Sequence, residues 1–401
     1  MDPDVNFKKV VTLEEGGHTL RFRVAQGLFS SHEVDRGTRL LLRSLAGHGA
    51  FQKVLDVGCG YGTIGLALKK VNGTGVVQML DRDALAVDYS HQNAELNGLA
   101  GVETYGSLGY DDVADRDFDL IAANIPGKAS EQVISSLLLE ARHYLRPGGM
   151  AAIVAVAPLA RTVISILEGS TRVHVLYREA SSGYALYHYR FSDGSNGETR
   201  PGQTALERGV YDRVAMTVAT GDLKFPMKTA DGLPQFDSLS YGTELLIKVM
   251  QSIGGPAARR AVVFNPGQGH VPVALWKMAG PDHIVLLDRD LLALRYSGLN
   301  LVLNQCPQER IGLEHRVGLA AQGRGPADLV VGVLRDGEGA EADALAIRQA
   351  AGQLAPGGTL LVASSSTAVT RLVKLVRAEG LLGVVKRRRK QGSSALVLRR
   401  R

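Results

Sequence analysis

Two kinds of side chain are scarce in this chain of 401 residues: cysteine, with two, and tryptophan, with one. Cys59 and Cys306 are too few for a disulfide framework or for a zinc site with four ligands. The chain lacks an apolar run long enough to cross a bilayer, and its first residues lack the basic-then-apolar order of a secretory signal. These absences predict a cytoplasmic protein with no membrane span and no bound metal. The length predicts two domains.

Positive charge is concentrated near the C-terminal end. The formal net charge is +6, yet residues 381–401 alone hold eight Lys or Arg and no acid, so the rest of the chain is slightly acidic. Clustered positive charge is typical of surfaces that bind phosphate backbones. A charged run of this kind is also used to keep the edge strand of a sheet soluble. The candidate nucleic-acid contacts are five adjacent residues: Lys386, Arg387, Arg388, Arg389 and Lys390.

The most informative stretch is residues 54–65, which read Val-Leu-Asp-Val-Gly-Cys-Gly-Tyr-Gly-Thr-Ile-Gly. An apolar strand runs into Asp56, and glycines at alternate positions precede a helical pattern. Such glycines let the chain turn sharply and let a ligand lie against the backbone, while the helix start offers free N–H groups. A second apolar strand ends at Asp81, where a carboxylate can accept hydrogen bonds from both hydroxyls of a ribose. The two features predict a nucleoside-containing cofactor bound across the first two strands of a parallel sheet.

A third segment ends in Asn124-Ile125-Pro126 after the apolar residues 118–123. This position places the Asn124 amide at the carboxyl edge of the sheet, beside the glycine turn. Pro126 lacks an N–H and has a fixed φ, so the preceding carbonyl is rigid. An amide oxygen and a rigid carbonyl can together accept hydrogen bonds from an exocyclic amine. Alone, the segment could be a simple strand-ending turn; with the glycine turn and Asp81 in register, we interpret it as a site for a substrate amine.

The chain also repeats itself. Landmarks recur in the same order at nearly constant separation: Gly27-Leu28 as Gly232-Leu233, residues 58–62 as 267–271, Leu80-Asp81 as Leu287-Asp288, and Gly148-Gly149 as Gly357-Gly358. Each copy has a strand-rich lead-in, then alternating strands and helices, which predicts a parallel sheet with helices on both faces. Each copy closes with two strands, predicted at 173–177 and 184–191 and at 383–387 and 395–399. The polar, Gly- and Pro-rich residues 192–203 are the predicted linker.

These motifs resemble class I S-adenosylmethionine-dependent methyltransferases. The lead-in Gly27-Leu28-Phe29-Ser30, followed by Asp35-Arg36-Gly37-Thr38, is similar to the small-domain rRNA guanine-N2 methyltransferases, which are tandem duplications with one live and one degenerate copy. The resemblance implies two tandem Rossmann-like, seven-stranded α/β domains, each a mostly parallel sheet with a closing antiparallel hairpin. It also implies a catalytic domain over residues 1–195 and a degenerate, RNA-binding or structural domain over 205–401.

The resemblance further implies roles for single residues. Asp56 would orient the methionine amino end of S-adenosyl-L-methionine, Asp81 would hold its ribose, and Ser107 would lie at its adenine. Close backbone contact with the cofactor would come from the turn residues Gly58, Cys59, Gly60 and Gly62. Asn124 and Pro126 would hold the target amine.

One position departs from the family. The residue after Asn-x-Pro is usually an aromatic that stacks on the target base, and here it is Gly127. The sequence leaves three aromatic side chains that could replace it: Phe29, Tyr105 and Tyr110.

The two copies are unequal, since Asp56 is replaced by Asn265 and Asn124 by Val333, while Asp81 is kept as Asp288. We therefore predict that the first copy transfers a methyl group to a guanine N2 of ribosomal RNA. Three alternatives remain open at this point. The first is a nicotinamide-dependent oxidoreductase, because Gly60, Gly62 and Gly65 also fit the dinucleotide pattern. The others are a non-catalytic RNA-binding module and a methyltransferase with a protein or small-molecule amine as acceptor.

Overall fold

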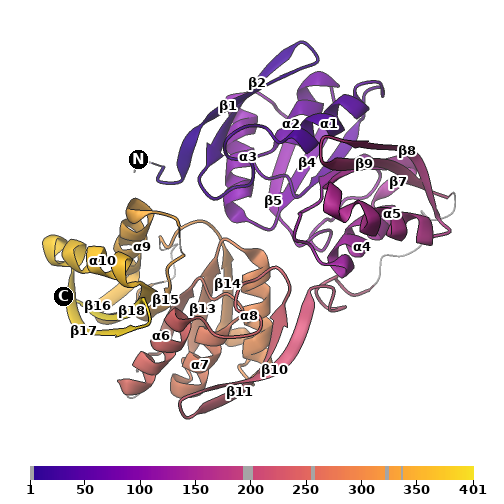
Figure 1. Cartoon of the computed structure of the whole chain (residues 1–401). Helices are drawn as coiled ribbons and strands as arrows, with labels where there is room; N and C mark the ends of the chain where they lie inside the picture. The colour runs from indigo at the N-terminus through magenta and orange to yellow at the C-terminus, as the bar shows by residue number, and fades with distance from the viewer. Residues whose placement is uncertain (1–3, 193–201, 254–257, 321–324, 336) are drawn as a thin grey trace. The chain divides into compact units, whose positions relative to one another are not determined.

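The computed structural model describes residues 4–192, 202–253, 258–320, 325–335 and 337–401. The chain forms two compact units (Figure 1). The N-terminal domain covers Phe7–Tyr211, and the C-terminal domain covers Asp212–Arg401 together with the described residues before Phe7. Most of the predicted linker, residues 193–201, lies outside the described residues.

The N-terminal domain is built on a seven-stranded sheet with the order β5-β4-β3-β6-β7-β9-β8. All neighbours are parallel except β9, which runs antiparallel to both β7 and β8. The strands are β3 (Lys53–Val57), β4 (Val76–Asp81), β5 (Val102–Gly106), β6 (Phe118–Asn124), β7 (Leu145–Val156), β8 (Val173–Ser181) and β9 (Tyr184–Phe191).

Helices cover both faces of this sheet (Figure 1). Side chains alternate along a buried strand, so Leu55 and Val57 of β3 pack with α4 and α5 while Asp56 faces α2. The helices are α1 (Arg36–Leu45), α2 (Thr63–Val71), α3 (Ala84–Leu96), α4 (Glu131–Leu139) and α5 (Ala160–Gly169), with 3-10 turns at η1 (Glu140–His143) and η2 (Ala157–Leu159).

A separate hairpin, β1 (Phe7–Glu15) with β2 (His18–Ala25), precedes α1 and packs on α3. Asn93 of α3 holds it in place: its side chain exchanges two hydrogen bonds with the backbone of Arg23 and donates a third to the carbonyl of Tyr61 in the glycine turn. Asn300 makes the same three contacts in the C-terminal domain, with Lys228 and Gln268. The duplication therefore extends to buried polar contacts that join the lead-in hairpin to the turn.

The C-terminal domain repeats the architecture, with the sheet order β14-β13-β12-β15-β16-β18-β17 and the hairpin β10-β11. Its strands are β10 (Asp212–Thr220), β11 (Leu223–Ala230), β12 (Arg260–Phe264), β13 (His283–Asp288), β14 (Ile311–His315), β15 (Ala327–Val333), β16 (Leu354–Ser365), β17 (Leu382–Lys390) and β18 (Ser393–Arg400). Its helices are α6 (Tyr241–Ser252), α7 (His270–Ala279), α8 (Leu291–Leu303), α9 (Ala340–Gln353) and α10 (Ser366–Glu379), with a 3-10 turn at η4 (Gln308–Arg310).

These sheets confirm the predicted fold class: two α/β domains, each with seven strands and a closing antiparallel hairpin. The closing hairpins are longer than predicted. Strand β8 continues to Ser181, where Ser182 and Gly183 turn the chain with positive φ values of 54° and 84°. The prediction ended early because the last residues of this edge strand are mostly polar and partly or fully exposed, so they carry no apolar alternation. Among the described helices, none has the length and apolar character needed to span a membrane.

Candidate active site at the carboxyl edge of the N-terminal sheet

Strand register brings the three predicted motifs of the N-terminal domain to one level. Val57 of β3 pairs with Leu80 of β4 on one side and with Ala123 of β6 on the other. The residues that follow these three, namely Gly58, Asp81 and Asn124, therefore lie together at the carboxyl edge of adjacent parallel strands. In open α/β sheets this edge is where ligands bind.

The glycine turn has the conformation that its sequence predicts. Gly58, Gly60 and Gly62 all have positive φ, at 75°, 58° and 90°. Such angles disfavour any side chain, and Gly62 passes the chain directly into α2. At Gly65, an added Cβ would lie 2.7 Å from the sulfur of Met79, so the helix packs against β4 without room for a side chain. The turn thus exposes backbone rather than side chains at the sheet edge.

Asp56 lies beneath this turn and is fully buried. One carboxylate oxygen accepts a hydrogen bond of 2.8 Å from the backbone N–H of Gly65, while the other accepts none from the described part of the chain. Burial raises the pKa of Asp56 to about 7; the Gly65 hydrogen bond opposes this shift and the charge of Asp81 adds to it. A buried acceptor without a donor fits a site that a cationic or hydrogen-bonding group completes.

Asp81 ends β4 and is anchored by backbone donors on both oxygens. Oδ2 accepts from the N–H of Gly60 at 3.0 Å, and Oδ1 accepts from the N–H of Asp83 at 2.9 Å. Each oxygen keeps a second lone pair, so the carboxylate can still receive two hydroxyl groups. Burial raises its pKa to about 6, against the hydrogen bonds that favour the ionised form.

Ser107 and Cys59, two further predicted cofactor residues, are buried and hydrogen-bonded within the protein. The Ser107 hydroxyl donates to the carbonyl of Gly109 at 2.9 Å and accepts from the N–H of Asp112 at 3.2 Å. The Ser107 backbone N–H also donates to the carbonyl of Asp81, which joins the end of β5 to that of β4. The Cys59 sulfur lies 3.2 Å from the hydroxyl of Ser90 on α3, and burial raises the pKa of its thiol. Cys59 is therefore a packing residue of the turn rather than a thiolate.

Asn124 lies at the end of β6, and its side-chain N–H2 group points back into the domain. Nδ2 donates to Oδ2 of Asp35 at 2.9 Å and to the hydroxyl of Thr38 at 3.2 Å. The next residues, Ile125 and Pro126, lead into a turn in which the Pro126 carbonyl accepts from the N–H of Ala129. Asp35 and Thr38 belong to the lead-in motif, but nothing in that motif indicates that they contact Asn124.

The three candidate stacking aromatics differ in accessibility. Tyr110 is buried, stacks on Tyr144 at 4.7 Å between ring centroids, and donates to the carbonyl of Leu137. Tyr105 is half-buried, and its hydroxyl donates to Gln78. Phe29 is 69% exposed. Its neighbour Ser30 accepts a hydrogen bond from the Tyr61 hydroxyl of the glycine turn, so the Phe29 loop lies against that turn.

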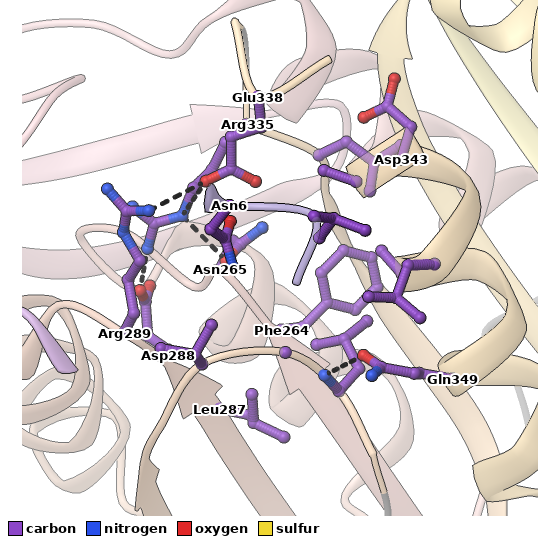
Figure 2. Close-up of a pocket in the computed structure, with 18 of the residues that line it drawn as sticks. Asn6, Phe264, Asn265, Leu287, Asp288, Arg289, Arg335, Glu338, Asp343 and Gln349 are labelled. Atoms are coloured by element: carbon purple, nitrogen blue, oxygen red, sulfur yellow. Dashed lines mark hydrogen bonds and ion pairs between the residues drawn. The ribbon is translucent and has the colours of Figure 1, made fainter. Parts of the chain in front are cut away.

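In the C-terminal domain, an arginine fills the position that corresponds to the N-terminal site (Figure 2). Phe264 pairs with Leu287 and Gly332, so Asn265, Asp288 and Val333 share one level of that sheet edge. The predicted replacement of Asp56 by Asn265 is therefore wrong by two positions: the strand register aligns Asn265 with Gly58 and the apolar Val263 with Asp56. Arg335, which stands where the first copy has Pro126, forms an ion pair with Asp288 and donates to the Asn265 amide oxygen at 3.1 Å.

The cavity beside Arg335 has a volume of about 90 Å3. This is small next to the roughly 300–1,000 Å3 of typical ligand pockets. Asp288, the acid that the duplication preserves, is thus paired with Arg335 of the same domain.

The predicted basic patch is divided between two faces of β17, the edge strand of the C-terminal sheet. Lys386 and Lys390 reach α6, where they contact Ser252 and Glu244. Arg387 reaches α10, where it donates to the carbonyl of Ser366 and the hydroxyl of Thr370. Arg388 and Arg389 are exposed, and because side chains alternate along a strand they point to opposite faces.

Comparison with known proteins finds similarity to methyltransferases in the N-terminal half. Residues 19–187 match the family model "Methyltransferase small domain". The uncharacterized protein YbxB of Bacillus subtilis is 36% identical over 129 residues, which cover 32% of this chain and 64% of that protein. Ribosomal RNA small subunit methyltransferase C of Haemophilus influenzae is 36% identical over 133 residues, covering 32% and 39%. The chain therefore matches less than two thirds of the length of these relatives.

A solved structure matches the whole chain in fold. It is the T. thermophilus 16S rRNA N2 G1207 methyltransferase (RsmC) in complex with AdoMet and guanosine, with a TM-score of 0.66, 19% identity and 98% coverage of both chains. The glycine turn, the acid of β4 and the Asn-x-Pro of β6 lie inside the matched segment. Residues 19–187 of this chain are thus similar to the methyltransferase small domain, and the whole chain shares its fold with this solved structure.

Proposed function

We propose that the N-terminal domain is an S-adenosyl-L-methionine-dependent methyltransferase of the cytoplasm that modifies the exocyclic N2 of a guanine in ribosomal RNA. The observation that carries this proposal is the shared level of the glycine turn, Asp81 and Asn124 at one sheet edge. That arrangement brings a nucleoside site and an amine acceptor within reach of each other. The substrate class, ribosomal RNA, comes from the rRNA methyltransferases to which the chain is similar.

The residues present fit this cofactor. Asp81 has the free lone pairs for two ribose hydroxyls, and the buried oxygen of Asp56 lacks a donor in the described part of the chain. When bound, the cofactor supplies an electrophilic methyl group on a sulfonium. Asn124 Oδ1 and the Ile125 carbonyl would accept the two protons of the target amine, which orients its nitrogen lone pair. Methyl transfer by in-line displacement depends mostly on such positioning.

The C-terminal domain has a different role in this proposal. Arg335 pairs with Asp288, and Val333 replaces the amide of Asn124, so this domain lacks both the open ribose acid and the amine acceptor. We therefore assign cofactor binding and catalysis to the N-terminal domain alone. The C-terminal domain would contribute to RNA binding.

The direct test is transfer of a tritiated methyl group from S-adenosylmethionine to purified small ribosomal subunits, followed by nucleoside analysis. We expect label in N2-methylguanosine and one S-adenosylhomocysteine bound per chain in a calorimetric titration. Label recovered in ribosomal protein would mean that the methyl acceptor is a protein rather than RNA. Binding of NADH without binding of S-adenosylhomocysteine would favour the oxidoreductase alternative.

Cofactor affinity should rise with pH between about 5.5 and 7.5. The raised pKa values of Asp56, about 7, and Asp81, about 6, mean that both carboxyls hold protons in mildly acidic solution. Binding an ammonium and two hydroxyls favours the ionised carboxylates, so S-adenosylhomocysteine binding should release protons near pH 6.5. Calorimetry in two buffers of different ionisation enthalpy measures this release. A proton uptake on binding, or an affinity that does not change with pH, would contradict the assignment.

Asp56 and Asp81 should make the folded state of the unliganded protein less stable as pH rises, whereas they make cofactor binding tighter. Their folded pKa values lie above the ordinary value of 3.8, so their contribution to the folded state is complete below about pH 4. It is lost as pH rises through about 6 to 7. The unliganded protein should therefore be less stabilised by these groups at pH 7.5 than at pH 5, and cofactor should offset the loss.

Phe29 is the proposed substitute for the aromatic residue missing at Gly127. It is exposed, and its loop lies against the glycine turn. Replacing Phe29 with alanine should weaken RNA binding by roughly 5- to 150-fold, the loss of about 1–3 kcal/mol for one stacked base. Filter binding with the small subunit measures this, and cofactor affinity is the control readout.

A second variant tests whether the two positions share this role. An added Cβ at Gly127 would lie 3.5 Å from Val156, an ordinary contact, so Gly127→Phe should fold. If Phe29 stacks on the base, Gly127→Phe should restore part of the affinity lost in Phe29→Ala. Unchanged RNA affinity in Phe29→Ala would exclude the stacking role.

Of the basic strand, only Arg388 and Arg389 are proposed as RNA contacts. Lys386, Arg387 and Lys390 are engaged with α6 or α10. Replacing both exposed arginines with glutamine should reduce the slope of log affinity against log salt by about 1.5, since each phosphate contact contributes about 0.7–0.9. Lys224→Gln with Lys277→Gln is the matched control, because both lysines are exposed elsewhere in the domain. An unchanged slope would remove β17 from the RNA-binding surface.

A further inference from the structure

Three elements that are distant in the sequence meet at the side chain of Asn124. Asp35 precedes α1 as its N-cap residue, Thr38 lies in the first turn of α1, and Tyr184 begins β9. The Asp35 carboxylate accepts from the Thr38 N–H at 3.0 Å, from Asn124 Nδ2 at 2.9 Å and from the Tyr184 hydroxyl at 2.8 Å. The Thr38 hydroxyl accepts a second bond from Asn124 Nδ2 at 3.2 Å.

This arrangement decides which end of the Asn124 amide faces outward. An ionised carboxylate can only accept hydrogen bonds, so the N–H2 group must point toward Asp35 and the amide oxygen must point away. Both protons of Nδ2 are used, by Asp35 and by Thr38. In the described part of the chain, the Asn124 oxygen accepts no hydrogen bond. An asparagine without such a partner can turn its amide by half a rotation at little cost, which would present donors to a substrate amine.

The second copy shows that capping the helix does not require the carboxylate that orients Asn124. Ser240 stands at the position of Asp35, and its hydroxyl still caps α6 by accepting from the Thr243 N–H at 3.1 Å. A hydroxyl is therefore sufficient for the cap, in line with the general preference for serine there. Where the carboxylate is absent, the threonine is kept as Thr243, but the other two partners are absent, since Val333 replaces Asn124 and Ser393 replaces Tyr184.

Gly37 shows how closely the Tyr184 ring fits in the first copy. An added Cβ would lie 2.6 Å from the Tyr184 ring and 2.9 Å from Oδ2 of Asp35, so any larger residue would displace both. At the corresponding Gly242, the nearest atoms are the hydroxyls of Ser240 and Ser393, at 3.8 and 3.9 Å. The tight packing belongs to the domain that retains the asparagine.

We propose that Asp35 is a positioning residue for the methyl acceptor: supported by Thr38 and Tyr184, it holds the Asn124 amide with Oδ1 directed at the substrate amine. This inference rests on the proposed function. It makes the acceptor site selective for a group that donates hydrogen bonds, such as an exocyclic amine, over a carbonyl.

The test places the second domain's residue, serine, at position 35 of the first domain. Asp35→Ser keeps a hydroxyl cap for α1 but removes the carboxylate that holds Asn124. We expect kcat for methyl transfer to fall about 10- to 100-fold, as for a misplaced reacting group. KM for the small subunit, S-adenosylhomocysteine affinity and the melting temperature should change little. Tyr184→Phe keeps the ring beside Gly37 and should lower kcat by a smaller factor.

A double substitution separates positioning from a general structural role. In an Asn124→Ala background, Asp35→Ser should cause no further loss of kcat, because its target is gone. The same fractional loss in both backgrounds would overturn the proposal, as would a loss confined to KM or to the melting temperature.

A readout independent of activity completes the test. In the full-length wild-type protein, the Asn124 side-chain N–H2 signals should show slow hydrogen exchange by NMR, and in Asp35→Ser the exchange should be faster. If the wild type transfers no methyl group, the proposed function fails, while the NMR result still decides whether Asp35 holds Asn124. Equal exchange in the two proteins would overturn the positioning role.

Discussion

Replacing Asn124 with alanine should lower kcat for methyl transfer by about 10²- to 10³-fold, the loss typical of removing one preorganised hydrogen-bonding group from an active site. The side chain lies at the end of β6 with its N–H2 group bound by Asp35 and Thr38. Its oxygen is therefore the atom that alanine removes from the acceptor site. Single-turnover transfer of a tritiated methyl group to small ribosomal subunits measures the effect.

The control for Asn124→Ala is Val333→Ala, the same position in the second copy. That variant should leave kcat unchanged, and neither should alter S-adenosylhomocysteine affinity more than about twofold, because both positions lie outside the cofactor contacts. A kcat within threefold of wild type for Asn124→Ala would mean that another group accepts the protons of the amine.

The second large effect is expected at Asp81. Replacing Asp81 with alanine should weaken S-adenosylhomocysteine binding by at least about 100-fold. Two hydroxyl bonds to a carboxylate are lost, each worth about 1.5–3 kcal/mol. The anchoring N–H groups of Gly60 and Asp83 also lose their acceptor, so Asp81→Asn is the gentler comparison. Calorimetric titration of the full-length chain measures both variants.

Asp288→Ala is the matched control for Asp81→Ala. Asp288 occupies the same place in the second copy but is paired with Arg335 (Figure 2). Its loss should leave the stoichiometry at one site and the affinity unchanged. Binding that depends on Asp288 rather than Asp81 would transfer the cofactor site to the C-terminal domain.

Much of the fold could be predicted from the sequence because its signals are local. A strand such as residues 76–81 is mostly apolar since most of its residues are buried, and glycines at 58, 60 and 62 mark positions whose φ is positive. The repeated landmarks predicted two similar domains, and the two sheets have the same strand order. Each of these features depends on a few neighbouring residues or on a comparison within the chain.

Charge clustering illustrates the limit of local reading. Five consecutive basic residues look like one patch, yet the strand conformation sends Lys386 and Lys390 to α6 and Arg387 to α10. Helix α10 directly precedes β17, but α6 lies far away in the sequence, with Ser252 134 residues before Lys386. Likewise, Arg335 in the sequence is only a replacement for a proline, whereas in the fold it neutralises the preserved acid Asp288.

The sequence by itself determined the α/β class, the duplication, the glycine turn, and the positions of Asp81 and Asn124 after it. It could do so because backbone geometry and apolar periodicity depend on neighbouring residues. Only the tertiary structure decided how the amide of Asn124 is oriented. Asp35 lies 89 residues before Asn124, and Tyr184 lies 149 residues after Asp35. Hydrogen bonds across such separations depend on how sheet and helices pack, and no local pattern encodes them.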